Sequence, residues 1–187
     1  MKYFKRLVGE RIYLSPLNME DAEIFTKWLN DFFVTDYIAN SSRINTLESE
    51  REWLQDTLNK QKPTFTIVKL ENDEMIGTCS LNDIDNIRRT ATLGIFIGED
   101  ENRSKGYGTE VLKLLLDYGF NYFNLNNIML TVYSFNERAM KAYKKAGFKE
   151  FGRRRKAYFL NGKYFDLVYM DILAEEFTES YIKNKNI

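Results

Sequence analysis

The sequence predicts an α/β (α+β) fold with a single mixed, mostly antiparallel sheet of about seven strands flanked by about four helices. Strand-length apolar runs interleave with amphipathic stretches of helical length. A chain of 187 residues with 44% hydrophobic residues can bury one sizeable core. Because no repeat or composition shift divides it, we expect one domain over residues 1–173 and a short helix with a polar tail over 174–187.

The N-terminal part predicts a strand and a helix. Residues 11–15 alternate and end at Pro16, and Asn18 with Asp21 resembles a helix start. The apolar face of this helix repeats at Ala22, Phe25 and Leu29.

A second helix is predicted after an aromatic stretch and a polar loop. Thr46 is a capping residue, and Glu48 and Glu50 fall in the first turn, where the helix dipole favours anions. Its predicted buried side consists of Trp53, Leu54 and Leu58.

The middle of the chain predicts an antiparallel meander. Residues 64–70, 75–81 and 90–98 have strand character, and residues 71–74 form a polar hairpin turn. Residues 107–123 then change to a helical period, with a polar face at Lys113, Asp117 and Asn121.

The last third predicts a strand, a helix and a hairpin. Gly147 ends the helix, and Asn161 with Gly162 marks the hairpin turn. The elements span residues 127–133, 136–146, 148–158 and 163–173.

Charge and rare residues exclude several function classes. Lys plus Arg and Asp plus Glu each total 27, so we expect neither nucleic acid nor a membrane as partner. The absence of histidine removes Ser/His and Cys/His nucleophiles and His-ligated zinc. Cys79, the single cysteine, lies in a predicted strand and is expected to be a buried structural thiol. Without an apolar signal or spanning run, we expect a cytoplasmic protein that uses no metal.

The segment 98–109 is the most informative, because an apolar strand leads through a polar turn into an amphipathic helix. A helix N-terminus leaves about four backbone N–H groups without intrahelical partners, which suits a phosphate. Gly106 and Gly108 allow close backbone approach, while Arg103 and Lys105 add positive charge. The segment is therefore a candidate phosphate-binding turn.

Other glycine-loop motifs fit this segment less well. A Walker loop needs lysine directly after its glycine, whereas Lys105 precedes Gly106. A dinucleotide fingerprint needs a third glycine where this chain has Val111. The remaining alternative is a glycine turn that only starts a helix.

Two motifs carry a resemblance to a known family. Arg103-x-x-Gly106-x-Gly108 resembles the acyl-CoA signature of the GNAT superfamily of N-acetyltransferases. The predicted element order resembles the family fold over essentially the whole chain, nearest to the branch of ribosomal-protein N-terminal, spermidine and small-amine acetyltransferases. The second motif resembles the second cofactor-binding segment of the family and reads Asn136-x-x-Ala139-x-x-x-Tyr143-x-Lys145-x-Gly147-Phe148.

The resemblance implies acetyl-CoA as cosubstrate, bound where the fourth and fifth predicted strands splay apart. Backbone groups around Phe96 and Ile97 would hold the pantetheine arm, and Asn136 would hydrogen-bond it. The pyrophosphate would rest on the backbone amides of Ser104, Lys105, Gly106, Tyr107, Gly108 and Thr109.

The resemblance also implies a general acid. Asn136 and Tyr143 are seven residues apart and return to nearly the same helix face. Tyr143 would lie near the thioester sulfur and protonate the leaving thiolate, a role typically worth about 10² to 10⁴ in rate. The alternative is that Tyr143 only packs.

The general base is the point where the chain departs from the family pattern. Many relatives carry Glu two residues before the fourth-strand glycine, where this chain has Thr92 before Gly94. Asp83 and Asp85, after the third predicted strand, are the nearest acidic candidates, although such acids also form turns. Direct attack with proton loss through ordered water is the other option.

The resemblance places the acceptor pocket at the aromatic residues between the first two helices. Its candidate members are Trp28, Phe33 and Tyr37, some of which also suit the core. The acceptor is expected to be a small polyamine, another small amine or a protein N-terminus, acetylated by direct attack.

Two other functions stay open. A catalytically weak acyl-CoA-binding regulatory module would fit Thr92 in place of a carboxylate. Nucleic-acid binding through the basic run 153–156 is opposed by the zero net charge, so we interpret that run as a solvated edge strand. A homodimer is a further expectation.

Overall fold

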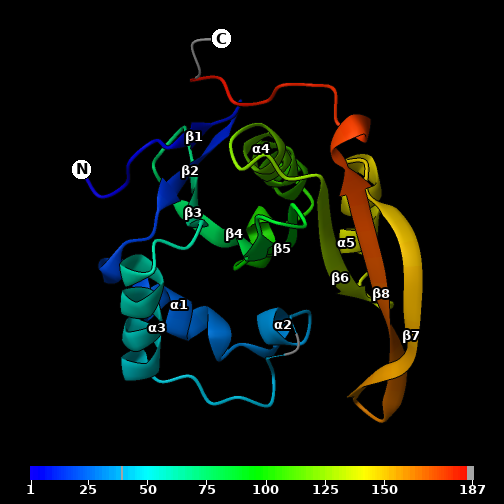
Figure 1. The fold of residues 1–187 in the computed structure, drawn as a ribbon. Helices are drawn as coiled ribbons and strands as arrows, with labels where there is room; N and C mark the ends of the chain where they lie inside the picture. Colours follow the sequence, from blue (N-terminus) through cyan, green and yellow to red (C-terminus); the bar gives the residue numbers. More distant parts are fainter. Residues whose placement is uncertain (39, 185–187) are drawn as a thin grey trace.

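The structure is a computed structural model that describes residues 1–38 and 40–184. Its centre is an eight-stranded sheet in the order β1-β2-β3-β4-β5-β6-β8-β7 (Figure 1). The strands are Leu7–Val8 (β1), Ile12–Pro16 (β2), Thr64–Lys69 (β3), Met75–Asp85 (β4), Thr90–Ile97 (β5), Asn127–Tyr133 (β6), Lys149–Leu160 (β7) and Lys163–Leu173 (β8). The α-helices are Ala22–Leu29 (α1), Phe32–Thr35 (α2), Leu47–Asn59 (α3), Tyr107–Asn121 (α4) and Glu137–Lys145 (α5). Short 3₁₀ turns occur at Met19–Asp21, Asp100–Asn102 and Ala174–Glu176. The predicted fold class is confirmed, with one more strand than the sequence suggested.

The sheet is antiparallel except between β5 and β6, which pair in parallel. The predicted meander corresponds to β3, β4 and β5. The additional strand β1 is only two residues long, too short for an alternating pattern to reveal. The β7–β8 hairpin turns at Asn161 (φ 47°) and Gly162 (φ 79°), as a tight turn with left-handed central residues requires.

The predicted splay lies between β5 and β6. These strands share three register pairs, the last of which joins Thr92 and Met129. Beyond it, β6 continues beside β8 to Tyr133, whereas β5 continues beside β4 to Ile97. Within the described residues, no strand covers the β6-facing edge of β5 over this stretch.

Hydrophobic clusters cover both faces of the sheet because successive strand residues point to opposite sides. In β2, Ile12 and Leu14 join the cluster that packs on α4, whereas Tyr13 joins the cluster of α1 and α3. Figure 1 shows α4 on one side of β4 and β5 and α1 with α3 on the other. β5, which borders the splay, is therefore packed on both faces.

The N-terminal helices differ from expectation in two places. Trp53 was predicted to be buried but is 40% exposed, because Leu54 and Thr57 form the inward face of α3. Trp53 instead packs edge-on against Phe25. The short helix α2, capped by the side chain of Asp31, falls in the aromatic stretch that shows no helical period.

The C-terminal segment changes the surroundings of α4. Asp117, predicted on a polar face, is 0% exposed. Its carboxylate accepts hydrogen bonds from the backbone N–H groups of Tyr181 (2.6 Å) and Ile182 (3.0 Å). The predicted terminal helix is the single turn Ala174–Glu176, after which the chain runs back across α4 toward β1 (Figure 1). The end of the predicted polar tail, residues 185–187, lies outside the described residues.

Candidate functional site

A cavity of about 600 Å³ opens where β5 and β6 separate. Its walls come from α2, β5, the turn before α4, β6 and α5. The predicted site residues that line it are Tyr37, Phe96, Ile97, Arg103, Ser104, Gly106, Gly108, Thr109, Asn136 and Tyr143. The predicted residues outside its lining are Trp28, Phe33, Asp83, Lys105 and Tyr107.

The turn before α4 and the first helical turn line this cavity with Ser104, Gly106, Gly108 and Thr109. Ser104 (φ 60°) and Gly106 (φ 87°) adopt left-handed conformations that turn the chain into the helix. No capping side chain satisfies the start of α4, and among the described residues no acceptor is found for the backbone amides of 104–109. A Cβ on Gly108 would meet no protein atom within 4 Å, so the space in front of the turn is open. This geometry suits a diphosphate.

Arg11 and Glu110 hold the turn from outside. The Arg11 guanidinium donates to the Lys105 carbonyl (2.9 Å) and pairs with the Glu110 carboxylate (3.1 Å). It also lies 5.0 Å from the ring centroid of Tyr107, whose side chain is thereby engaged outside the cavity. Neither Arg11 nor Glu110 was predicted as a site residue, because 99 positions separate them along the chain.

Arg103 links the end of β5 to α2 through hydrogen bonds to backbone carbonyls. Its guanidinium donates to the carbonyls of Ile97 (3.1 and 3.0 Å), Gly98 (3.2 Å) and Phe33 (3.1 Å). The side chain is only 9% exposed, and burial lowers the pKa of Arg103. The residue therefore ties the end of β5 to α2 while lining the cavity.

The predicted acceptor aromatics separate in the structure. Trp28 is 2% exposed and packs edge-on against Phe96 at 6.0 Å. Its indole occupies the space that a Cβ on Gly98 would need, 2.1 Å away. Phe33 is 80% exposed on the outer side of α2. Trp28 thus supports β5 from behind, and neither ring lines the cavity.

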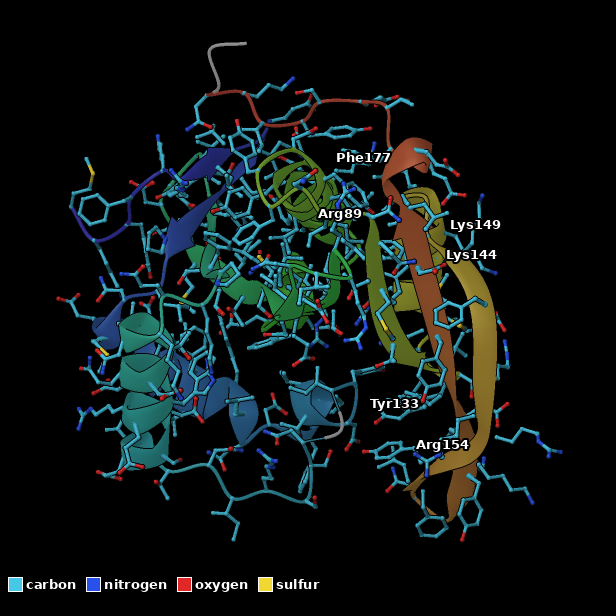
Figure 2. All side chains as sticks on the ribbon, in the orientation of Figure 1. Arg89, Tyr133, Lys144, Lys149, Arg154 and Phe177 are labelled. Carbon is cyan, nitrogen blue, oxygen red and sulfur yellow. The ribbon has the colours of Figure 1, made fainter. Side chains whose placement is uncertain are left out.

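An aromatic cluster that sequence analysis did not identify borders the cavity beside Tyr37. The Tyr37 ring lies 5.7 Å from Phe135, which stacks on Tyr133 at 5.9 Å. Tyr133 stacks on Tyr158 at 4.3 Å, and its burial raises the pKa of Tyr133. Tyr133 lines the cavity, and Figure 2 marks it at the end of β6 nearest α2. No local motif links these residues, because they come from three distant segments.

The cavity face of α5 carries the two residues of the second motif. Asn136 caps the helix, its side-chain oxygen accepting from the Ala139 N–H (3.2 Å), which leaves the amide NH₂ for a ligand. Tyr143 packs edge-on against Phe148 at 6.1 Å. Burial raises the pKa of Tyr143 to about 12, so its hydroxyl is a hydrogen-bond donor at all ordinary pH values.

The lining is cationic. Arg138, Lys141 and Lys145 follow one another on one side of α5. No Asp or Glu lines the cavity among the residues that the structure describes. Thr92 and Asn82, which are cross-strand partners, supply neutral polar groups there.

The two acidic base candidates lie in the last three residues of β4, which extends further than the sequence predicted. Asp83 is exposed, with φ 50°, at the irregularity in the β4–β5 register. The Asp85 carboxylate accepts from the backbone N–H groups of Arg88 (2.8 Å) and Ile87 (2.9 Å) and pairs with the Arg88 guanidinium, contacts that lower the pKa of Asp85. Asp85 is therefore a turn residue.

Two further predictions from the sequence concern the basic run 153–156 and Cys79. The basic run 153–156 is exposed on β7, the last strand of the sheet, which confirms the edge-strand interpretation (Arg154 is marked in Figure 2). Cys79 is 1% exposed, and burial raises its pKa well above the usual value, as expected of a structural thiol. In residues 1–38 and 40–184, no cluster of three or more His, Cys, Asp or Glu side chains could hold a metal. Nor does this part of the chain contain a helix with the length and apolar character needed to cross a bilayer.

Comparison with known proteins agrees with this geometry. The family model described as an acetyltransferase (GNAT) domain matches residues 11–149. The uncharacterized N-acetyltransferase p20 of Bacillus licheniformis is 30% identical over 91% of this chain and 97% of its own length. The spermidine N(1)-acetyltransferase of Escherichia coli K12 is 35% identical over 56% of this chain and 55% of its own. The crystal structure of a Vibrio cholerae spermidine N-acetyltransferase with CoA and spermine is similar at a TM-score of 0.81 and 25% identity, covering 89% of this chain and 98% of that one.

Proposed function

The chain belongs to the GNAT acetyltransferase family, and from that premise we propose which groups bind acetyl-CoA, which group acts as acid and where the amine enters. It is an acetyl-CoA-dependent N-acetyltransferase that acylates an amine. The observation that carries the proposal is the turn at 104–109, whose amides have no acceptor among the described residues and four of whose residues line the cavity.

The cofactor-binding groups lie along the splay. The pyrophosphate rests on the amides of residues 104–109. Lys105 and Tyr107 contribute backbone only, because neither lines the cavity and the Tyr107 ring lies against Arg11. The free edge of β5 at Phe96 and the Asn136 amide hold the pantetheine arm. The Ile97 carbonyl is already bound by Arg103, so Ile97 serves through its other backbone and side-chain atoms.

Acetyl-CoA supplies an activated thioester, and the chain's own residues orient the attack on it. The amine nitrogen forms the new C–N bond as the C–S bond breaks. The nitrogen loses one proton and the leaving thiolate gains one. Tyr143 donates a hydrogen bond to the sulfur, supported by its place in the lining and its protonated state. Tyr37 borders the amine. Trp28 packs behind β5, and Phe33 contributes only its backbone carbonyl, which accepts from Arg103.

The alternative is a catalytically weak acyl-CoA-binding module, favoured by the single observation that Thr92 replaces a carboxylate in the lining. Free thiol released from acetyl-CoA distinguishes the two functions, with a thiol reagent as the readout over a panel of amines. We expect amine-dependent release that collapses in Gly106→Val, because the left-handed φ of 87° and the approach of Arg11 disfavour a branched side chain. Gly162→Val, also left-handed but in the β7–β8 turn, controls for backbone strain. Cofactor binding without turnover on any amine would favour the module.

We further propose that residues 1–173 form the acetyltransferase domain and that the protein works in the cytoplasm as a homodimer. The reduced, buried Cys79 supports a reducing compartment. Exposed aromatic residues on the β7–β8 hairpin, Phe159 and Tyr164, support self-association. Sedimentation velocity showing only monomer at micromolar concentration would contradict the dimer.

A further inference from the structure

Building on the proposed acetyl transfer, we propose that the acceptor is the α-amino group of a peptide or amino-acid amide and that polyamines are poor substrates. The inference rests on the charges and hydrogen-bonding groups that line the cavity. It assigns the class of amine to a site whose transfer chemistry is already described.

The lining offers no carboxylate to an amine. Nearby acids are already paired: Asp100 is 85% exposed and lies 3.4 Å from Arg103 and 3.7 Å from Arg138, both of which line the cavity. Asp166 accepts from the Lys156 N–H (3.0 Å) in the hairpin. A polyamine carries two or more ammonium groups, and the protein lining supplies no carboxylate to pair with those that do not react. The missing carboxylate therefore disfavours polycations.

The missing carboxylate also limits which amines can react. Only a neutral nitrogen can form the C–N bond, and the chain has no histidine to remove the proton. At pH 7.5 about a third of an α-amino group with pKa 7.7–8.0 is neutral, against roughly one in 800 of an alkylamine with pKa near 10.4. An α-amino acceptor deprotonates in water before it binds and needs no base from the protein.

The neutral polar groups suit the carbonyl that accompanies an α-amine. The Asn82 amide donates to Ser80 Oγ (2.8 Å) and keeps a second N–H, and Thr92 lies beside it as cross-strand partner. In the same lining, Tyr37 and Tyr133 supply aromatic surface for an uncharged side chain. The cavity lining thus offers both hydrogen-bonding groups for a peptide and an aromatic surface for its side chain.

The first experiment compares matched amines at pH 7.5 by thiol release: alaninamide, isopropylamine and spermidine. We expect kcat/KM for alaninamide to exceed that for isopropylamine roughly 250-fold, reflecting their neutral fractions. The gap should close as the pH rises toward 10, because only the alkylamine is still deprotonating. A higher kcat/KM for spermidine than for alaninamide would overturn this inference and leave acetyl transfer intact. Release with no amine at any pH would remove the proposed function itself.

The second experiment restores a carboxylate with the isosteric change Asn82→Asp. The ratio of kcat/KM for spermidine to that for alaninamide should rise about 10-fold, because the new charge pairs with a second ammonium. Gln55→Glu, the same amide-to-acid change on the exposed side of α3, is the matched control and should leave the ratio unchanged. An Asn82→Asp enzyme with the original ratio would show that the missing carboxylate does not set the preference.

Discussion

The two ends of the cavity are built in different ways. The cofactor end is one contiguous turn, 103–109, whose function depends on backbone conformation and helix geometry. The acceptor end is assembled from side chains of α2, β4, β5 and β6, with Tyr158 of β7 behind them. A short motif can encode the first end, whereas only the tertiary fold creates the second. Substrate choice can therefore change through scattered side chains while cofactor binding is preserved.

The sharpest test of the cofactor end is Gly108→Val. A Cβ at this position meets no protein atom within 4 Å, so the variant should fold normally. A branched side chain would still fill the space where the diphosphate approaches. We expect acetyl-CoA affinity, measured by calorimetry, to fall about 1,000-fold, since losing two hydrogen bonds to a charged group costs about 3–6 kcal/mol.

Gly152→Val provides the control for this loss, because Gly152 also has an open Cβ position but lies on β7. Its thermal midpoint and its acetyl-CoA affinity should match the parent protein. Undiminished acetyl-CoA binding in Gly108→Val would show that the space in front of the turn does not hold the cofactor. The turn at 103–109 would then not be the cofactor end of the cavity.

Tyr143→Phe tests the point where the two ends meet. The change removes only a hydroxyl that has no partner among the described residues, so cofactor affinity should stay within about 2-fold. Turnover should fall about 100-fold, at the low end for positioned acid catalysis, because a phenol with a raised pKa is a weak proton donor. Equal kcat values for the two proteins would assign Tyr143 to packing.

The pH profile adds to this test. Burial raises the pKa of Tyr143 to about 12, so the acid form persists throughout the alkaline range below that value. Activity should rise with pH as the amine loses its proton and should show no falling limb below about pH 10. A falling limb near pH 8 that disappears in Tyr143→Phe would contradict the raised pKa.

The elements that the sequence predicted well have strong local signals. Thr46 accepts from the Ser49 N–H as an N-cap, and the β3–β5 meander follows three separate apolar runs. The errors concern residues whose surroundings come from distant parts of the chain. Asp117 looks polar on a helical wheel, yet the C-terminal segment covers it and donates to its carboxylate. Helical periodicity cannot reveal that a distant segment of the chain buries a residue on the polar face of a helix.

The same division applies to the site. Gly106 and Asn136 could be located from their motifs because their positions follow from local geometry. Arg103 was expected to offer its charge to a phosphate, but its guanidinium is engaged by three carbonyls that only the folded chain brings together. Tyr133 belongs to an aromatic cluster built by strand pairing, which no sequence window contains.

The smallest effect is expected for Asp83→Asn at the acceptor end. Asp83 is exposed beyond the cavity lining, and Asn tolerates its left-handed φ of 50° as well as Asp does. We expect kcat to change less than about 2-fold, within the range of ordinary surface substitutions. Asp85→Asn is the contrasting variant, because it weakens the turn contacts to Arg88 and should lower the thermal midpoint without selectively lowering turnover. A loss of turnover above about 30-fold in Asp83→Asn, with cofactor affinity retained, would identify Asp83 as the base. The acceptor end would then hold a carboxylate after all, and an alkylamine could be deprotonated there.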